Sequence, residues 1–298
     1  MVTKVQKKNN QASVPDEQKG ATLYMVATPI GNLEDITLRT IRILKEVDLI
    51  ASEDTRHTRK LLSYFDIHTP LVSYHKDREA AQAQKLLDRL RAGEDIAMVS
   101  DAGTPAISDP GTILARKALE FGIKVTPVPG PSALTAALSI SGLDTTRFLF
   151  LGFPPSRRNQ RVKFLKILSE NPHTLVFFES PHRIVRCLKD CIETLGDRNV
   201  FLARELTKIH EETITGTLSG VLANLLNREF IKGEFTIIIK GAERKGPEEG
   251  DLTELLLWYR DQSELSMKDA VQRIAQDLGE SRSHVYKIAL NIWAGVQK

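Results

Sequence analysis

A loop rich in glycine, proline and short polar side chains follows an apolar run near the middle of the chain. Residues 99–111 read VSDAGTPAISDPG. Gly103 and Gly111 allow the backbone to adopt positive φ or to approach a ligand closely, and the prolines stiffen it. The loop also places polar groups on Asp101, Thr104, Ser108 and Asp109. It reads either as a ligand-binding segment or as a tight connection between core elements.

Four more apolar runs end in loops of the same kind. The five runs span residues 23–27, 48–51, 70–74, 96–99 and 124–128. Apolar residues with helical spacing lie between them, as at residues 36–44 and 86–90. Strands that alternate with helices predict a mainly parallel sheet, whose ligands bind beyond the carboxyl ends of its strands. All five loops fall at that edge, so packing alone explains them poorly.

Beyond residue 145 the arrangement of the apolar runs changes. Further strands are expected at residues 148–151, 174–178, 200–203, 212–218 and 235–240. The run at 212–218 alternates apolar and polar residues, as a half-exposed strand does. We therefore expect an α/β protein with two α/β domains. Residues 21–143 would hold the mainly parallel sheet and residues 144–245 a mixed sheet, with the linker near residues 141–147.

The composition fits a soluble globular protein of two domains with an appendage. The chain has 298 residues, of which 41% are hydrophobic and 27% charged, and a formal net charge of +3. We find no apolar stretch near the ~20 residues of a membrane span and no apolar core of a secretory signal, so no membrane partner is expected. Residues 1–20 are polar and are expected to form a disordered tail.

Two cysteines, Cys187 and Cys191, lie four residues apart in a helical pattern. No further cysteine and no clustered histidine completes a metal site, so the sequence predicts no metal. We expect both thiols to be reduced and part of the core of a cytoplasmic protein.

A run of basic residues follows the turn at residues 152–155. Residues 156–166 contain five cations and no acid. The five cations are Arg157, Arg158, Arg161, Lys163 and Lys166. Such a run suits contact with the phosphates of a nucleic acid, and a solvated helix start is at least as common an explanation.

The C-terminal segment, residues 250–298, is expected to form a small helical domain. Gly279 and Val285 occupy the turn and core positions of a helix-turn-helix, and Ser281 is a candidate N-cap of its second helix. A plain helical hairpin that packs or dimerises is the alternative, so reading of a nucleic-acid groove does not follow from the pattern.

Several common catalytic and nucleotide-binding motifs are absent from the sequence. It contains neither a G-x-x-x-x-G-K-[ST] phosphate loop nor a G-x-G-x-x-G segment after the first strand. Residues 129–133, PGPSA, differ from the G-x-S-x-G elbow of esterases. By elimination, the loops suit a ligand with few phosphates that is held by backbone groups and hydroxyls.

Seven motifs follow one another in a recognisable order. They are residues 28–32 (TPIGN), 52–57 (SEDTRH), 100–105 (SDAGTP) with 108–111 (SDPG), 129–133 (PGPSA), 178–183 (FESPHR), 203–208 (ARELTK) and 232–235 (KGEF). Over about residues 21–295 the chain resembles the tetrapyrrole methylase superfamily. The motifs at 53–56 and 204–208 resemble its ribosomal-RNA-methylating branch and differ from the porphyrin and corrin methylases.

The resemblance implies a fold and a reaction. The tetrapyrrole-methylase-like fold has two α/β domains with S-adenosylmethionine (SAM) in the cleft between them, and here the small helix-turn-helix-like domain follows. The implied reaction is methylation of the ribose 2′-oxygen of a cytidine in the decoding region of 16S ribosomal RNA. The implied partners are the small ribosomal subunit and a second copy of the chain in a homodimer.

The resemblance also implies which residues bind SAM, a cationic sulfonium joined to adenosine. Matched motif by motif, they are Ile30, Asp101, Gly103, Thr104, Ile107, Ser132, Ala133, Phe178, Gly233, Glu234 and Phe235. Asp101 has the strongest claim to a direct contact, and a carboxylate that only caps its loop is the alternative. The candidates for RNA binding are Arg157, Arg158, Arg161 and Lys163.

Methyl transfer to a ribose hydroxyl requires a positioned acceptor and a route for its proton. The catalytic candidates are Glu53, Asp54, Arg56, His57, His75, Arg204, Glu205 and Lys208. Lys208 qualifies as a base only if its amine is neutral. Arg204, Glu205 and Lys208 suit a structural ion-pair network equally well, and the sequence selects no single base.

One segment departs from the family pattern. After the third strand the family tends to have His, then an acid or similar residue, then His-Asn, whereas here residues 76–78 after His75 read KDR. We expect this loop to face the substrate and to tolerate variation, and His75 is its member worth testing.

Two alternative functions stay open at this point. The same fold and cofactor would serve methylation of a porphyrin- or corrin-like macrocycle, although a small macrocycle needs neither the basic run nor the helical tail. The other alternative is a nucleic-acid-binding regulator whose cleft is vestigial, and the intact cleft loops argue against it.

Overall fold

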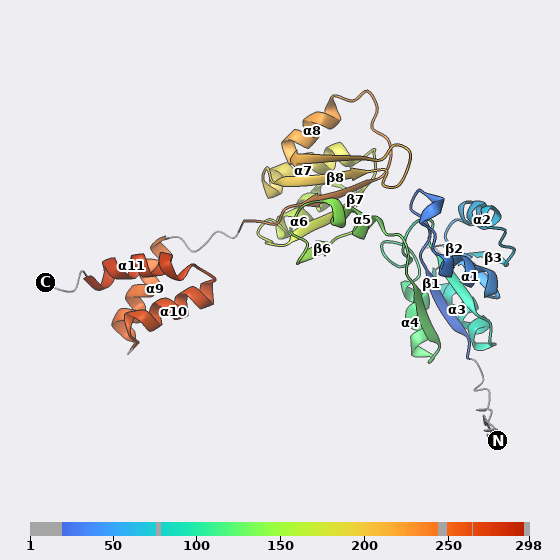
Figure 1. Ribbon diagram of the computed structural model, residues 1–298, viewed down its shortest axis with the longest axis horizontal. Helices are drawn as coiled ribbons and strands as arrows, with labels where there is room; N and C mark the ends of the chain where they lie inside the picture. Colours follow the sequence, from blue (N-terminus) through green and yellow to red (C-terminus); the bar gives the residue numbers. More distant parts are fainter. Residues whose placement is uncertain (1–19, 76–78, 244–248, 264, 295–298) are drawn as a thin grey trace, which may run out of the picture. The chain divides into compact units, whose positions relative to one another are not determined.

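The computed structural model describes residues 20–75, 79–243, 249–263 and 265–294. The chain divides into two compact units (Figure 1). The α/β unit comprises residues 1–169 and 173–241, and the helical unit comprises residues 170–172 and 242–298. Apart from Gly20, the tail expected at residues 1–20 lies outside the described residues.

The first sheet of the α/β unit is entirely parallel, in agreement with the mainly parallel sheet that the sequence predicts. Its strands are β1 (Thr22–Val26), β2 (Leu49–Ser52), β3 (Leu71–Ser73), β4 (Ile96–Val99) and β5 (Lys124–Val128). They run in the order β3-β2-β4-β1-β5, with every neighbouring pair parallel. The carboxyl ends of all five strands therefore deliver their loops to one edge.

Helices cover both faces of this sheet. They are η1 (Leu33–Asp35), α1 (Leu38–Glu46), α2 (Thr55–Tyr64), α3 (Glu79–Arg91) and α4 (Thr112–Glu120). Apolar residues of α3 and α4 pack with one face, and those of α1 and α2 pack with the other. A strand buried on both faces needs a continuous apolar run, which explains why β4 reads IAMV and is buried throughout.

The second sheet is mixed, which confirms the predicted fold class. Its strands are β6 (Phe148–Phe150), β7 (Thr174–Glu179), β8 (Asn199–Arg204), β9 (Glu212–Thr217) and β10 (Phe235–Ile239). The order is β6-β7-β10-β8-β9, in which only the β6–β7 pair is parallel. Strand β9 alternates in exposure, in agreement with its alternating sequence.

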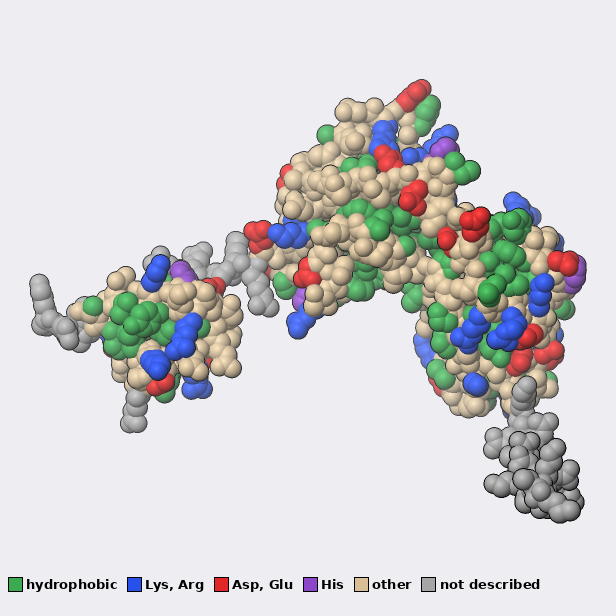
Figure 2. Space-filling model, in the orientation of Figure 1, with side chains coloured by type: hydrophobic (Ala, Val, Ile, Leu, Met, Phe, Trp, Pro, Cys, Tyr) green, Lys and Arg blue, Asp and Glu red, His purple; other side chains and the backbone are tan. Residues whose placement is uncertain are grey.

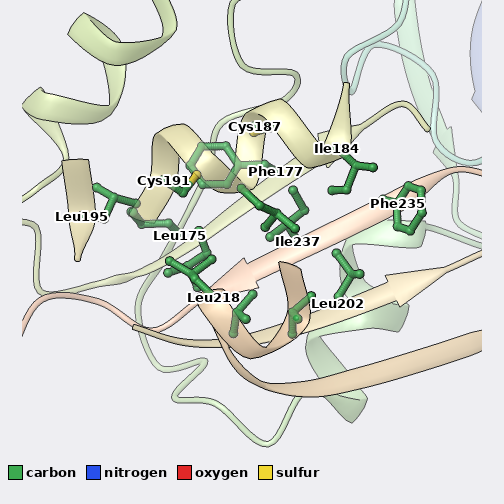
Figure 3. Packing of buried hydrophobic residues seen from close by; sticks show 14 of the residues in the cluster. Leu175, Phe177, Ile184, Cys187, Cys191, Leu195, Leu202, Leu218, Phe235 and Ile237 are labelled. Carbon is green, nitrogen blue, oxygen red and sulfur yellow. The ribbon is translucent and has the colours of Figure 1, made fainter. Parts of the chain in front are cut away.

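One face of the second sheet is covered by α6 (Arg158–Ile167), α7 (Ile184–Leu195) and α8 (Leu218–Leu226). In this core Cys187 and Cys191 of α7 lie beside Phe177 of β7 (Figure 3). Both cysteines are free and buried, which confirms the prediction of reduced core thiols. The other face packs against α5 (Ala133–Ile140) and against Ile30 and Leu206, which come from cleft loops.

The helical unit consists of α9 (Glu249–Gln262), α10 (Met267–Leu278) and α11 (Arg282–Ala294) around a core of its own. Gly279 ends α10 in the left-handed conformation. The Ser281 hydroxyl accepts the His284 amide at 3.2 Å, so the expected N-cap is confirmed. Figure 2 shows hydrophobic side chains gathered on the visible face of this unit, with Lys and Arg side chains beside them. Within the described part of the chain, no helix combines the length and apolarity needed to cross a bilayer.

A buried ion pair joins α6 to α7. Arg161 is 3% exposed, and its Nε donates to Oδ2 of Asp190 at 2.7 Å. Its Nη1 also donates to the carbonyls of Pro155 and Ser156, at 3.1 and 3.0 Å. Burial makes each charge depend on its partner, because a guanidinium without a counter-charge is costly to keep away from water.

We therefore expect Asp190→Ala to lower the free energy of unfolding by about 3 kcal/mol, because it leaves Arg161 buried and uncompensated. The matched control is Glu193→Ala, which removes a surface partner of Arg158 that is 57% exposed. That change should cost no more than about 0.5 kcal/mol. Urea unfolding followed by circular dichroism measures both. Equal stabilities of the two variants would contradict this account of the pair.

Candidate functional site

The loops at the carboxyl edge of the first sheet are tied to one another. The amides and carbonyls of Thr28 and Gly103 exchange hydrogen bonds of 2.9 and 3.0 Å. Asp101 Oδ1 accepts the amide of Asp54 at 2.9 Å, and Asp54 in turn caps α2 by accepting the Arg56 amide at 2.7 Å. The carboxylate of Asp101 thus links two loops of this edge, while the residue also lines a cavity described below.

The main cavity lies between loops of the two sheets and has a volume of about 450 Å³. This is within the range of small-molecule sites. It contains nine of the eleven residues predicted to bind the cofactor: Ile30, Gly103, Thr104, Ile107, Ser132, Ala133, Phe178, Glu234 and Phe235. The structure thus brings together residues that are up to about two hundred positions apart in the sequence.

A second hollow, the side cavity, adjoins the main one and has a volume of about 490 Å³. The two share Ile30, Ala102, Lys208 and Glu234 in their walls. The rest of the side cavity's lining comes from the TPIGN loop and Leu33, from Ser100 and Asp101, and from α2 between His57 and Tyr64. Two adjoining cavities with a shared wall suit a reaction between two substrates that meet at that wall.

Backbone strain concentrates in the loops around these cavities. Among the described residues, five that are not glycine have positive φ, and four of these lie in two site loops. The four are Ala106, Ser108, Glu205 and Thr207, with φ between 51° and 68°. Such conformations persist only where surrounding contacts enforce them, and they cluster at functional sites.

Two glycines permit a close approach of the loops. A Cβ atom on Gly31 would overlap the Lys208 side chain and would lie 2.9 Å from Thr207 Oγ1. Gly233, with φ of +93°, would place a Cβ against the Glu205 side chain, 2.9 Å from Oε1. Gly233 itself is not among the residues that line either cavity. Its absent side chain makes room for Glu205.

Lys208 forms ion pairs at the shared wall. Its Nζ lies 2.8 Å from Oε1 of Glu205 and 3.0 Å from Oε2 of Glu234. Burial alone would lower the pKa of Lys208, but hydrogen bonds to the two carboxylates outweigh it and hold the pKa above its usual value. The side chain is therefore an ammonium at neutral pH, which removes the neutral amine that a base would need.

The remaining catalytic candidates occupy different places. Asp54 caps α2, and Arg56 and His57 are exposed on the first turn of that helix. Only His57 among these three lines the side cavity. Glu53 lies close enough to Asp109 for its negative charge to raise the pKa of that carboxyl. Of the others, His75 donates its amide to Gln82, and Arg204 pairs with Glu212 on β9.

The basic run on α6 is only partly available to a ligand. Arg161 is buried and paired with Asp190, so it is not exposed to a ligand, and the prediction that it binds RNA is wrong. Arg158 pairs with Asp190 and Glu193. Arg157 and Lys163 are exposed. The pairing partner lies 29 residues beyond Arg161 in the chain, so the local sequence pattern contained no sign of it.

The site also includes residues that sequence reasoning missed. Asp109, Phe153 and Glu179 line the main cavity, and Lys60 and Tyr64 line the side cavity. Burial and the negative charges of Glu53 and Asp101 raise the pKa of Asp109 to about 6. Its place in the SDPG motif was the available signal. Among the described residues, no group of three potential metal ligands comes together.

Comparison with known proteins agrees with this geometry. Residues 22–222 match the family Tetrapyrrole (Corrin/Porphyrin) Methylases. A protein of Halalkalibacterium halodurans named Ribosomal RNA small subunit methyltransferase I is 44% identical over 94% of this chain and 98% of its own. A protein of the same name from Xylella fastidiosa is 51% identical over 74% of this chain and 82% of its own.

Solved structures of macrocycle methyltransferases share the fold. A cobalt precorrin-4 methyltransferase superposes with a TM-score of 0.58 at 20% identity, over 77% of this chain and 98% of its own. A uroporphyrin-III C-methyltransferase from Thermus thermophilus, solved with S-adenosyl homocysteine, gives a TM-score of 0.53 at 22% identity. It covers 74% of this chain and 97% of its own.

The raised pKa of Asp109 predicts that Asp109→Asn stabilises the ligand-free protein at pH 8. The unfolded chain ionises this carboxyl near pH 3.8 and the folded chain near pH 6, so the folded state loses stability across that interval. The expected gain is about 1 kcal/mol, well below the full pKa shift, because the carboxyl is partly exposed. At pH 3, below both pKa values, the gain should vanish.

Thermal unfolding at the two pH values measures this difference, with Asp35→Asn as an exposed control. A destabilised Asp109→Asn protein at pH 8 would show that the carboxylate makes favourable contacts that outweigh its repulsion.

Proposed function

Since this chain belongs to the tetrapyrrole methylase family, and its cofactor is SAM, we propose that it methylates the ribose 2′-oxygen of a cytidine in small-subunit ribosomal RNA. The proposed target is position 1402 of 16S RNA, in the decoding region. The proposal includes action on the small ribosomal subunit, a homodimer and a cytoplasmic location.

The residues of the main cavity fit the chemistry of SAM. Its walls combine apolar side chains, such as Ile30 and Phe178, with the hydroxyls of Thr104 and Ser132. The acidic side chains at the site, Asp101, Asp109 and Glu234, suit a ligand that carries positive charge. When bound, SAM supplies a methyl group that is activated for transfer by its sulfonium. Residues 103 and 132, which lie next to each other and both line the cavity, would hold the donor through backbone groups.

The choice of RNA as the acceptor rests on how much of this chain its relatives match. The Halalkalibacterium relative matches over 94% of this chain, so the similarity includes the helical unit. The likeness to the cobalt precorrin-4 methyltransferase covers 77% and supports the fold alone. The extent of the match therefore favours RNA over a macrocycle.

Lys208 and Glu234 would act on the acceptor at the wall that both cavities share. The Lys208 ammonium would donate a hydrogen bond to the ribose oxygen and stabilise the partial negative charge that develops on it as its proton leaves, before the new O–C bond uses up that charge. Glu234, 3.0 Å from Lys208, accepts the hydroxyl proton and passes it to solvent. Glu205 positions Lys208 from the buried side.

Replacement of Lys208 by Met should lower kcat about 100-fold, because it removes the positive charge beside the reacting oxygen while it keeps the length of the side chain. The dissociation constant of SAM should change less than about three-fold, since the cavity walls remain. Titration calorimetry and initial rates measure the two effects. Lys85→Met, on the exposed face of α3, is the matched control. A loss of SAM affinity equal to the loss of rate would contradict the assignment.

The function itself is tested with tritiated SAM and small ribosomal subunits from a strain that lacks this modification. Label should appear in the RNA and, after digestion to nucleosides, in 2′-O-methylcytidine. Label on a base, or transfer only to a precorrin offered in parallel, would overturn the proposal.

A further inference from the structure

Helix α2 presents an exposed face of cations, of which the sequence had singled out only Arg56 as a candidate. Residues 55–65 contain three strong cations and no acid. Arg56, Arg59 and Lys60 recur at helical spacing on one side of the helix, and Tyr64 follows one turn after Lys60. All four side chains are exposed. We call these four residues the α2 surface.

The cations of the α2 surface differ from those of α6. Among the described residues, no carboxylate lies within salt-bridge distance of Arg56, Arg59 or Lys60. On α6, in contrast, Arg158 and Arg161 already share the carboxylate of Asp190. Asp54 is close enough to Arg56 for their charges to interact, although no salt bridge forms. Cations outside salt bridges retain more of their attraction for a polyanion, whereas paired ones must first exchange a partner.

The α2 surface is continuous with the reaction site. A shallow depression of about 610 Å³ runs over Arg56, Arg59, Lys60 and Tyr64. Lys60 and Tyr64 also line the side cavity, which in turn shares Lys208 and Glu234 with the main cavity. Three adjoining hollows thus lead from the proposed donor site to a cationic helix face.

Tyr64 adds an aromatic surface to this path. The side chain is 68% exposed, although burial of an aromatic ring is normally favourable. The ring of Phe65 meets it edge to face, with a centroid distance of 4.9 Å and an interplanar angle of 77°. Exposed aromatic rings beside cations are the means by which proteins hold single-stranded nucleic acid, through base stacking and phosphate contacts.

We propose that the α2 surface binds a single-stranded RNA segment next to the ribose that is methylated. Arg56, Arg59 and Lys60 contact phosphates, and Tyr64 stacks on a base. The inference rests on the proposed function and deepens it, because it assigns the path by which the RNA reaches the side cavity.

The first test measures binding of a short fluorescent single-stranded RNA with the decoding-region sequence, at several salt concentrations. The double variant Arg59→Ala, Lys60→Ala should bind at least ten-fold more weakly at low salt. Its plot of log affinity against log salt should be shallower by about 1.4, for two lost phosphate contacts. The matched control is Lys85→Ala, Arg116→Ala, which removes two exposed cations from α3 and α4 and should bind like the wild type.

A second variant pair isolates the stacking contact. Tyr64→Ala should lower RNA affinity roughly 5- to 150-fold with an unchanged salt slope, because a base-stacking contact carries no charge. Tyr64→Phe should restore affinity to within about three-fold of the wild type, since the aromatic face remains. The SAM dissociation constant, measured by calorimetry, should stay unchanged in all these variants and reports that the fold is intact.

The outcomes separate this inference from the function. If the wild type methylates small subunits, and the α2 variants bind RNA with wild-type affinity and slope, the α2 inference is overturned and the function stands. If Arg157→Glu with Arg158→Glu weakens RNA binding and the α2 variants do not, the RNA lies over α6 instead. If the wild type neither binds nor methylates RNA, the function itself fails and this inference with it.

Discussion

The close approach of loops from the two sheets is the constraint on which the site depends. Gly31 and Gly233 leave no room for a side chain, because a Cβ atom at either position would meet Lys208 or Glu205. The amide of Asn32 also donates to Thr207 Oγ1 at 3.1 Å. These contacts fix the wall shared by the main and side cavities, and Lys208 with its two carboxylates stands in that wall.

The charges around this wall are divided by sign. Acidic side chains, among them Asp109 and Glu234, gather at the main cavity, and their mutual repulsion contributes to the raised pKa of Asp109. Three exposed cations lie on α2, of which Lys60 lines the side cavity. Such a division suits a cationic methyl donor on one side and a polyanionic acceptor on the other. Ser108 and Glu205, which have positive φ, lie in the loops that carry these charged side chains, so the contacts of the site also hold a strained backbone in place.

Much of the fold could be predicted from the sequence, because its signals are local. Apolar runs predicted all ten strands found in the described residues, and the bounds of β4 and β5 agree to the residue. Gly279 and Ser281 marked a helix end and a helix start through turn and capping chemistry. The helices that alternate with β1 to β5 made the parallel sheet, and with it the position of the cleft, predictable.

The sequence could not predict interactions that depend on distant partners. The role of Arg161 was mistaken because Asp190 reaches it from another helix. The charge state of Lys208 depends on Glu205, in the same motif, but also on Glu234, which is 26 residues away. The raised pKa of Asp109 depends on burial and on Glu53 and Asp101. Of the α2 surface, the sequence pointed only to Arg56, because the significance of Arg59, Lys60 and Tyr64 comes from the hollow that joins them to the cavities.

A structure of the protein with S-adenosyl homocysteine and a decoding-region RNA tests the central claim most directly. The account predicts the cofactor product in the main cavity, beside Thr104 and Asp109, and the 2′-oxygen of the target cytidine next to Lys208 at the shared wall. A ribose that approaches from any side other than the side cavity, or a cofactor product outside the main cavity, would contradict it.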